Sequence, residues 1–378
     1  MYKKIFIIFI FMFIFLPFNV FGEELIPNST SGILMEASTG KIIYEKDKDK
    51  EVSIASMTKM VAQIIILEEI DKGNIKWSDK VTVSENAASM GGSQIYLSAG
   101  EEITIDDLMK GISVASGNDA TVAMAEVIAG SEEKFVELMN KKVKSLGLKH
   151  TKFKNCTGLD EEGHYSTAYD QAVIARYLIN NHPTILEYSS IYEDYLRENT
   201  FWLVNTNKLI RFYDGADGLK TGHTDNAGYC LAATAKRNDL RLIAIVLGEK
   251  DSKVRNSETM SLLDYGFNTL KVNVLKSKGE VVKKVKLDKA NKEIVQIVLK
   301  DNLVVITDSI DRKKYNYKIT LNDLKLPLKK EKIIGKIDAL YKDKVVSSSN
   351  LTVIEDINKI SFISLYKKSI NDILTGIY

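Results

Sequence analysis

The chain has 378 residues, which is long enough to bury one large hydrophobic core and a second, smaller one. Its 52 basic and 50 acidic residues leave a formal charge of +2, so overall charge gives no argument for a nucleic-acid partner. The four histidines show no His-Glu-x-x-His or other zinc spacing. We therefore expect neither a nucleic-acid-binding protein nor a metalloenzyme, and we expect no cofactor.

The N-terminus has the features of an export signal. Lys3 and Lys4 precede an apolar run, Ile5–Phe18, that is too short to span a bilayer comfortably. Val20 and Gly22 occupy the two small-residue positions of a signal-peptidase site. We predict a signal peptide over residues 1–22, with an uncleaved anchor as the alternative, and hence an exported protein acting at the outer face of the cytoplasmic membrane or in the cell wall.

The chain contains two cysteines, Cys156 and Cys230. In an exported protein they permit a disulfide without requiring one. Cys230 lies in an apolar, strand-like run, so we expect two buried thiols.

The first three quarters of the chain alternate between extended and helical patterns. Residues 32–36 and 41–45 flank Ser38-Thr39-Gly40, which is turn chemistry between two strands. Residues 54–70 are apolar on most sides, which predicts a helix buried within a domain. Further helices are expected at 104–111, 120–128, 132–146 and 258–270, and a strand pair at 229–234 and 240–247. This order predicts an α+β domain whose antiparallel sheet combines strands from both of its sequence ends.

Beyond residue 273 the sequence changes to short apolar runs separated by charged turns. The expected strands are 281–287, 294–299, 303–306 and 315–319. We predict an α+β domain over 23–272 and a small all-β domain over 273–356. Residues 357–378 space isoleucines and leucines among lysines, as an interfacial helix does, although docking onto the β domain explains them equally well.

Ser56 and Lys59 are the first candidates for chemistry. They stand three residues apart at the start of the predicted buried helix, so their side chains share one face, and the helix N-terminus favours negative charge on the serine oxygen. A lysine acts as a base only when it is neutral part of the time. Burial and a second nearby cation both favour the neutral form.

Two further motifs follow in order. Ser-x-x-Lys and Ser-x-Asn each recur in the chain, whereas Lys-Thr-Gly occurs once, at Lys220-Thr221-Gly222. A single combination places Ser56 and Lys59, then Ser116-Gly117-Asn118, then Lys220-Thr221-Gly222 within the α+β domain.

These motifs and their flanks resemble the low-molecular-mass penicillin-binding proteins that are serine D-alanyl-D-alanine carboxypeptidases of the peptidase S11 family. The flanks are Ala55–Met60, Ser116–Ala120, Asn155–Leu159, His164–Asp170 and Asp217–Thr224. The resemblance implies a penicillin-binding/β-lactamase-like domain followed by a small β domain. It also implies peptidoglycan stem peptides as substrates, β-lactams as covalent inhibitors and no cofactor. A sporulation-type member is one form this family takes.

The resemblance also implies roles for four residues of the first two motifs. Ser56 attacks the carbonyl between two terminal D-alanines, and Lys59 takes its proton. Ser116 relays a proton to the leaving D-Ala, while Asn118 binds the substrate backbone and orients Lys59.

The remaining implied residues lie on an expected edge strand. Lys220 supplies positive field near the substrate carboxylate, and Thr221 and Thr224 donate hydrogen bonds to that carboxylate. Gly222 allows close approach, and the backbone N–H of His223 completes the oxyanion hole with that of Ser56.

Two other functions remain open at this stage. A β-lactamase needs a second base, and the one Glu-x-x-Asn spacing between the second and third motifs, Glu137 to Asn140, falls in a helical pattern. A penicillin sensor or inactive wall-binding protein would not require the full set of catalytic motifs.

Overall fold

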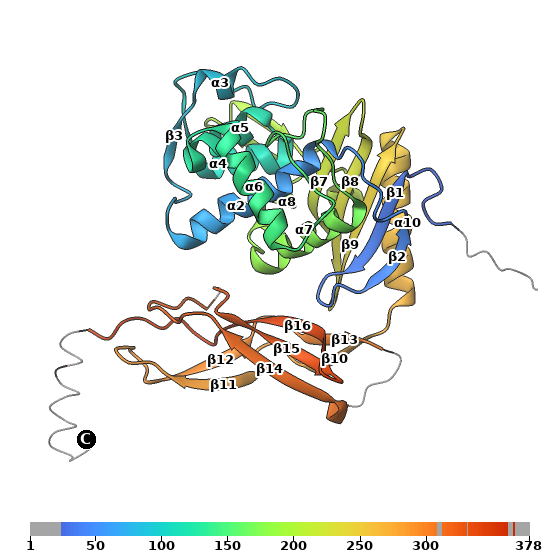
Figure 1. Ribbon diagram of the computed structural model, residues 1–378. Coiled ribbons are helices and arrows are strands. Elements are labelled where there is room, and N and C mark those ends of the chain that lie inside the picture. The colour runs from blue at the N-terminus through green and yellow to red at the C-terminus, as the bar shows by residue number, and fades with distance from the viewer. Residues whose placement is uncertain (1–23, 308–311, 331, 362–365, 367–378) are drawn as a thin grey trace, which may run out of the picture.

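The computed structural model describes residues 24–307, 312–330, 332–361 and 366. They form two domains, an α+β domain running from β1 to α10 and an all-β domain from β10 to β16, as the sequence predicted (Figure 1). The expected signal peptide and most of the expected tail lie outside the described residues. Within the described residues, no helix is long and apolar enough to span a membrane.

The α+β domain is built on a five-stranded antiparallel sheet of order β2-β1-β9-β8-β7. The strands are β1 (Ser31–Glu36), β2 (Ile42–Lys46), β7 (Ala216–Thr224), β8 (Gly228–Arg237) and β9 (Leu240–Glu249). N-terminal and C-terminal strands therefore share one sheet, which confirms the prediction. β7 is an edge strand, as expected for the strand that carries Lys220.

Helices cover both faces of this sheet. The side chains of successive strand residues point to opposite faces, so Ile33 packs in the core shared with helix α7 (Ala168–Asn181), while Leu34 packs in the core beneath α10 (Ser252–Thr269). Both faces of the sheet are buried, which explains the nearly continuous apolar runs of β1 and β9.

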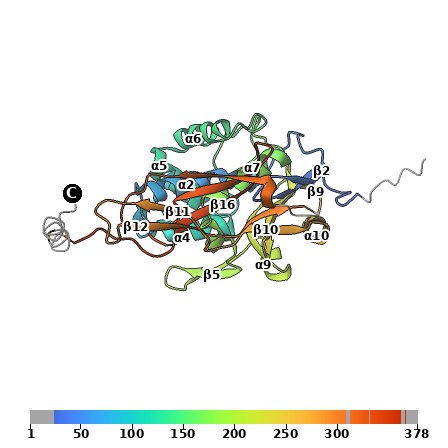
Figure 2. The same cartoon turned by 90° about the horizontal axis from the view of Figure 1, so that it is seen from below.

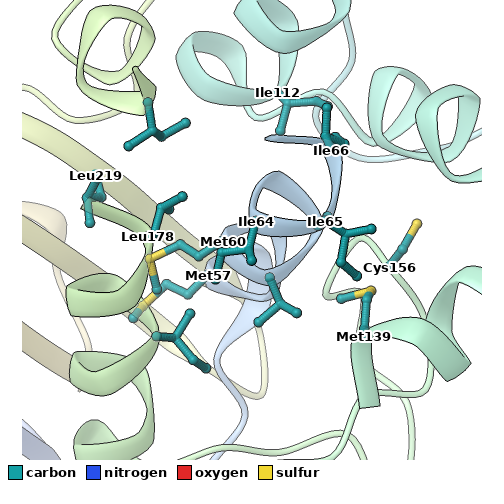
Figure 3. Close-up of a cluster of buried hydrophobic side chains, with 14 of the residues drawn as sticks. Met57, Met60, Ile64, Ile65, Ile66, Ile112, Met139, Cys156, Leu178 and Leu219 are labelled. Carbon is teal, nitrogen blue, oxygen red and sulfur yellow. The ribbon is translucent and has the colours of Figure 1, made fainter. Parts of the chain in front are cut away.

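Helix α2 (Lys59–Lys72) runs through the middle of the helical cluster. Its N-terminal half is buried on all sides, as the apolar sequence predicted. Figure 3 shows Ile65 directed toward Cys156 and Ile66 toward Ile112, so neighbouring residues of one turn pack against different segments. Both cysteines are buried and free, which confirms the expected buried thiols.

Other elements surround α2. They are α3 (Glu85–Ala88), α4 (Ile105–Lys110), the π-helical turn η2 (Gly111–Ala115), α5 (Asn118–Ala129), α6 (Glu132–Ser145), α8 (Ile185–Ser189), α9 (Leu209–Phe212), the strand pair β3 (Lys80–Thr82) with β4 (Glu102–Thr104), and the hairpin of β5 (Glu193–Leu196) with β6 (Phe201–Val204). The predicted helices near 104, 120 and 132 are confirmed within about two residues at each end, which is the ordinary uncertainty of such boundaries. Ser131 caps α6 by accepting from the Lys134 N–H.

The β domain contains a five-stranded antiparallel sheet of order β11-β12-β16-β15-β14 and the strand pair β10-β13. The strands are β10 (Val272–Lys276), β11 (Val281–Lys286), β12 (Ile294–Leu299), β13 (Leu303–Ile306), β14 (Tyr315–Leu321), β15 (Gly335–Tyr341) and β16 (Lys344–Val353), with a short 3₁₀ turn η3 (Arg312–Lys314). The Asn350 side chain donates to the Asn180 carbonyl at 2.9 Å, which ties β16 to α7.

The expected boundary at residue 357 differs from the structure. Ile357 is buried in the β-domain core, and its backbone exchanges two hydrogen bonds with Leu328. Ile360 also donates its N–H to the Lys289 carbonyl. The β domain therefore extends through residue 360, because Ile357, at the start of the predicted tail, fills its core and Ile360 is hydrogen-bonded to its backbone.

Candidate active site

Ser56 lies in a tight 3₁₀ turn, η1 (Ala55–Thr58), that leads directly into α2. Ala55 has φ +48°, a conformation that costs energy for a residue with a Cβ. Two glycines pack on this turn. A Cβ at Gly222 would lie 2.5 Å from the Ile54 carbonyl oxygen, and one at Gly158 would collide with the Ala55 carbonyl. The edge strand and a loop thus clamp the turn from two sides.

The Lys59 ammonium is fully buried and makes three hydrogen bonds. Its Nζ donates to Ser56 Oγ at 2.8 Å, Asn118 Oδ1 at 2.7 Å and the Thr157 carbonyl at 2.8 Å. Burial lowers the pKa of Lys59 from 10.5 to about 7, against smaller opposing effects of Cys156 and Asp119. A substantial fraction of Lys59 is therefore neutral near pH 7 and able to accept the proton of Ser56.

Ser116 and Asn118 lie where the π-helical turn η2 meets α5. Ser116 is buried and adopts a left-handed conformation, φ +63°, which ends the turn. The Asn118 backbone N–H donates to the Ser93 carbonyl at 2.7 Å, and its side-chain amide donates to the Gly91 carbonyl at 2.6 Å. With its oxygen on Lys59, Asn118 joins the loop around Gly91 to the base of the site.

Lys220 reaches the site from the middle of β7. It is 1% exposed, and its Nζ donates to the Thr221 carbonyl at 3.1 Å. Burial lowers its pKa well below the usual 10.5, and the neighbouring charges of Lys59 and Arg255 lower it further. The site therefore holds two closely placed lysines in a low-dielectric environment. A bound anion would favour the charged form of either one.

The outer half of β7 faces a loop and a turn. Thr221 Oγ1 donates to Thr206 Oγ1 at 2.7 Å, and Thr224 Oγ1 donates to Asp160 Oδ1, also at 2.7 Å. The His223 ring is exposed and stacks on Tyr229 with ring centroids 4.0 Å apart. Both threonine hydroxyls thus have protein partners that a substrate carboxylate would have to replace or share.

The loop before α7 supplies groups that sequence reasoning missed. Besides the Thr157 carbonyl and Asp160, it contributes His164, whose Nε2 lies 2.8 Å from Thr58 Oγ1. The Lys154 N–H donates to His164 Nδ1 at 3.3 Å, so Nε2 carries the proton and donates to Thr58. Burial lowers the pKa of His164 to about 4. The segments Asn155–Leu159 and His164–Asp170 resemble the family, and this resemblance was the signal that could have indicated a role for His164.

Arg255 is a second group that the sequence did not indicate. It lies on the first turn of α10, is 5% exposed, and is close enough to lower the pKa of Lys220. It adds positive charge behind the site.

The candidate second base of a β-lactamase lies on the exposed surface of a helix. Glu137 is exposed on α6, and the Asn140 side chain is bonded to the backbone of Val136 and Phe153. The Glu-x-x-Asn spacing follows from helix packing.

Comparisons with known proteins identify the family of both domains. Residues 23–251 match the family described as D-alanyl-D-alanine carboxypeptidase, and residues 271–359 match the penicillin-binding protein 5 C-terminal domain. The D-alanyl-D-alanine carboxypeptidase DacF of Bacillus subtilis is 45% identical over 93% of this chain and 91% of its own length. DacA of Escherichia coli is 34% identical over 89% of this chain and 85% of its own.

Solved structures give the same result. Penicillin-binding protein 5 of Haemophilus influenzae superimposes with a TM-score of 0.65 at 31% identity, over 88% of this chain and 98% of that one. Penicillin-binding protein D2 of Listeria monocytogenes, in its ampicillin-bound form, gives 0.59 at 30% identity, over 64% and 98%. The chain therefore belongs to the D-alanyl-D-alanine carboxypeptidase family, peptidase S11, and carries the penicillin-binding protein 5 type of C-terminal domain.

Proposed function

We propose that the protein removes the terminal D-Ala from peptidoglycan stem peptides through an acyl-enzyme on Ser56. The observation that carries this proposal is the Lys59 ammonium, buried and 2.8 Å from Ser56 Oγ, with a pKa lowered to about 7. A neutral Lys59 accepts the hydroxyl proton as Oγ bonds to the carbonyl carbon between the two D-alanines. The C–N bond then breaks, and the leaving amine takes up a proton.

Ser116 passes that proton from Lys59 to the leaving D-Ala, and water afterwards hydrolyses the ester. Asn118 holds Lys59 at 2.7 Å, which fixes the base against the nucleophile. The N–H groups of Ser56 and His223 stabilise the oxyanion. Ser56 belongs to the clamped η1 turn and His223 to β7, so the donors are held in place before substrate arrives.

The substrate carboxylate binds beside Lys220. A carboxylate next to this buried lysine raises its pKa again, so binding of substrate charges Lys220 and Lys220 attracts substrate. Thr221 and Thr224 add hydroxyl donors along the same strand, and Gly222 keeps that strand against the Ser56 turn.

β-Lactams acylate the same serine. Structures of the Listeria relative carry ampicillin and cefotaxime, and the proposed Ser56 chemistry applies equally to a lactam carbonyl.

The protein acts outside the cytoplasm, where the proposed peptidoglycan substrate lies. We propose that residues 1–22 direct export and that the segment after Ser361 attaches the mature protein to the membrane surface through apolar side chains and Lys367 and Lys368. Deleting the residues after Ser361 is expected to abolish co-sedimentation with anionic vesicles. Equal binding by the truncated protein would rule the attachment out.

The decisive experiment measures D-alanine released from a peptide ending in D-Ala-D-Ala, together with labelling by a fluorescent penicillin. Ser56→Ala is expected to abolish both, because one oxygen performs both acylations. Ser131→Ala, at a Ser-x-x-Lys sequence that caps α6, is the matched control and should retain both. Labelling of the Ser56→Ala protein would refute the assignment, and labelling of wild type without D-alanine release would favour a penicillin sensor.

A further inference from the structure

The β5–β6 hairpin has apolar residues on both of its faces. On one face, Leu196 and Leu203 are each 1% exposed and pack in the core of the helical cluster. On the other face, Tyr195 and Trp202 are direct partners across the two strands and are 49% and 57% exposed. A ribbon that packs on a domain by one face ordinarily has polar side chains on the other. Packing among the described residues does not account for this aromatic pair.

The hairpin is held rigidly beside the loop that precedes β4. The Arg197 guanidinium donates to Glu101 Oε1 at 2.6 Å and to the Ile95 carbonyl at 2.9 Å, and it lies 5.3 Å from the centre of the Phe201 ring. Phe201 in turn meets Tyr96 edge-on, with ring centroids 6.0 Å apart. A surface fixed in this way loses little conformational entropy when it binds a ligand.

The same hairpin leads directly into the wall of the active site. Thr206, two residues after β6, accepts the hydroxyl hydrogen bond of Thr221 from the Lys-Thr-Gly motif. Asn207 then donates to the Gly218 carbonyl at 3.0 Å. Trp202 precedes Thr206 by four residues and so lies at most about 14 Å from it. The aromatic pair is therefore continuous with the place where the stem peptide is proposed to bind.

The hairpin also stands clear of the β domain. Figure 2 shows β5 projecting from the side of the molecule opposite α6, beyond the outline of the β-domain strands. A long polymeric ligand can therefore reach it without displacing any described part of the protein.

The chemistry of the exposed face suits a sugar. Glu193 lies on the same face as Tyr195, two residues earlier, and is exposed. A pyranose ring presents C–H groups on its faces, which complement the electron-rich faces of Tyr195 and Trp202. Its hydroxyl and N-acetyl groups donate hydrogen bonds to a carboxylate such as Glu193. An anionic lipid surface is a poorer fit, since it attracts clustered basic residues and repels this carboxylate.

We propose that Tyr195 and Trp202 form a saccharide platform that binds β-1,4-linked N-acetylated amino sugars of the peptidoglycan strand while an attached stem peptide occupies the active site. The proposal rests on the proposed function for the identity of the polymer. It makes the enzyme prefer polymeric substrate over free peptide.

Direct binding is tested with the purified full chain and a β-1,4-linked N-acetylglucosamine tetramer, by calorimetry and tryptophan fluorescence. The chain has two tryptophans, Trp77 and Trp202, so the part of the ligand-dependent signal that is lost in Trp202→Phe reports on Trp202. Trp202→Ala is expected to weaken binding about fivefold to tenfold, and the Tyr195→Ala/Trp202→Ala double variant more. Trp202→Phe keeps a ring and should retain part of the affinity. The matched control is Tyr265→Ala, an exposed aromatic on α10.

Turnover separates this proposal from the proposed function. The double variant should release D-alanine more slowly than wild type from soluble uncrosslinked peptidoglycan strands below saturation, and at the wild-type rate from a short peptide without sugar. Failure of wild type to bind the tetramer, or equal binding by the double variant, overturns the platform. So does loss of binding to phosphatidylglycerol vesicles in the double variant with tetramer binding unchanged, which would assign the pair to the membrane. Absence of D-alanine release from both substrates by wild type would instead refute the proposed function, while tetramer binding would still support the platform.

Discussion

The two domains differ in what they bury. The α+β domain encloses charged side chains, among them Lys59, Asp119, Lys220 and Arg255, each at most 5% exposed. In the β domain, among the side chains that the structure describes, Asp338 is the one charged group that is buried, and it accepts from the Ser348 hydroxyl. The hydrophobic cluster of that domain is aliphatic, and the other buried polar side chains are uncharged.

This difference indicates which buried residues stabilise the fold and which have another role. Burying a charge is costly, and an apolar replacement of similar volume is often neutral or stabilising. The roles proposed for Lys59 and Lys220 would explain why lysines are retained in the core of the α+β domain. The β domain follows the ordinary rule for a packed core, so its substitutions should change folding and leave the reaction alone.

The largest effect is expected at Lys59. Lys59→Met should slow acylation by a penicillin by about 10²- to 10⁴-fold, because the base is lost while the apolar stem remains. Wild-type stability rises with pH between about 7 and 10.5, since the unfolded chain holds a proton on Lys59 that the folded chain has released. The variant should lose that part of the pH dependence.

Denaturant unfolding at pH 7.5 and 9.5, alongside stopped-flow acylation, measures both effects. Lys134→Met, on the exposed surface of α6, is the control. A Lys59→Met protein that acylates normally would remove Lys59 as the base, and one that is unfolded would show that the buried ammonium is needed for the fold.

The pH profile of acylation provides the next test. The rate constant should rise about tenfold per pH unit below the pKa of Lys59, near 7, and level off above it, because the neutral form is the reactive one. In the complex with a penicillin, whose carboxylate charges Lys220, Lys220→Gln should move this rising part of the profile to higher pH, since removal of a neighbouring positive charge makes protonation of Lys59 easier. If the rising part of the pH profile stays in place, the two lysines are not electrostatically coupled.

An element or a site residue could be predicted from the sequence where neighbouring residues alone determine it. Helix α2 was found because its apolar residues surround the helix, and Ser56, Lys59 and Lys220 were found through motifs. The β5–β6 hairpin was missed because its turn has positive φ at Arg197, Glu198 and Asn199, without the glycine that usually marks such a turn.

The missed parts of the site share one physical cause. The Thr157 carbonyl binds Lys59 from 98 positions along the chain, and a backbone acceptor leaves no trace in residue identity. Arg255 lies three positions before the start predicted for its helix, in a polar stretch of the sequence. Only packing of α10 brings it near Lys220.

A smaller effect is expected at His164, which we place as a positioning residue. It joins the loop that carries Thr157 to Thr58, between the proposed nucleophile and base. His164→Leu should lower kcat/KM about tenfold to a hundredfold, because it leaves Thr58 and the Lys154 N–H without their partner and loosens the Thr157 contact to Lys59. His164→Gln supplies one donor and one acceptor and should restore most of the activity. The pH at which the acylation rate levels off should shift in the Leu variant alone. An equal loss in both variants, with no shift, would assign His164 to packing only.

The smallest effect on the reaction is expected in the β domain, where the comparison predicts a change in stability without a change in chemistry. Ile337 lies in the middle of β15 and is 1% exposed in the aliphatic core. Ile337→Ala should destabilise the β domain by about 2–5 kcal/mol through lost burial and the cavity left behind. Lys59 and Ser56 meet none of the atoms affected, so hydrolysis of a short D-Ala-D-Ala peptide should stay within about twofold of wild type below the new melting temperature. Calorimetric unfolding and D-alanine release on the same sample measure both quantities. A large loss of activity in a protein whose α+β domain still melts normally would show that the β domain shapes the active site, and the separation between the two domains would then be wrong.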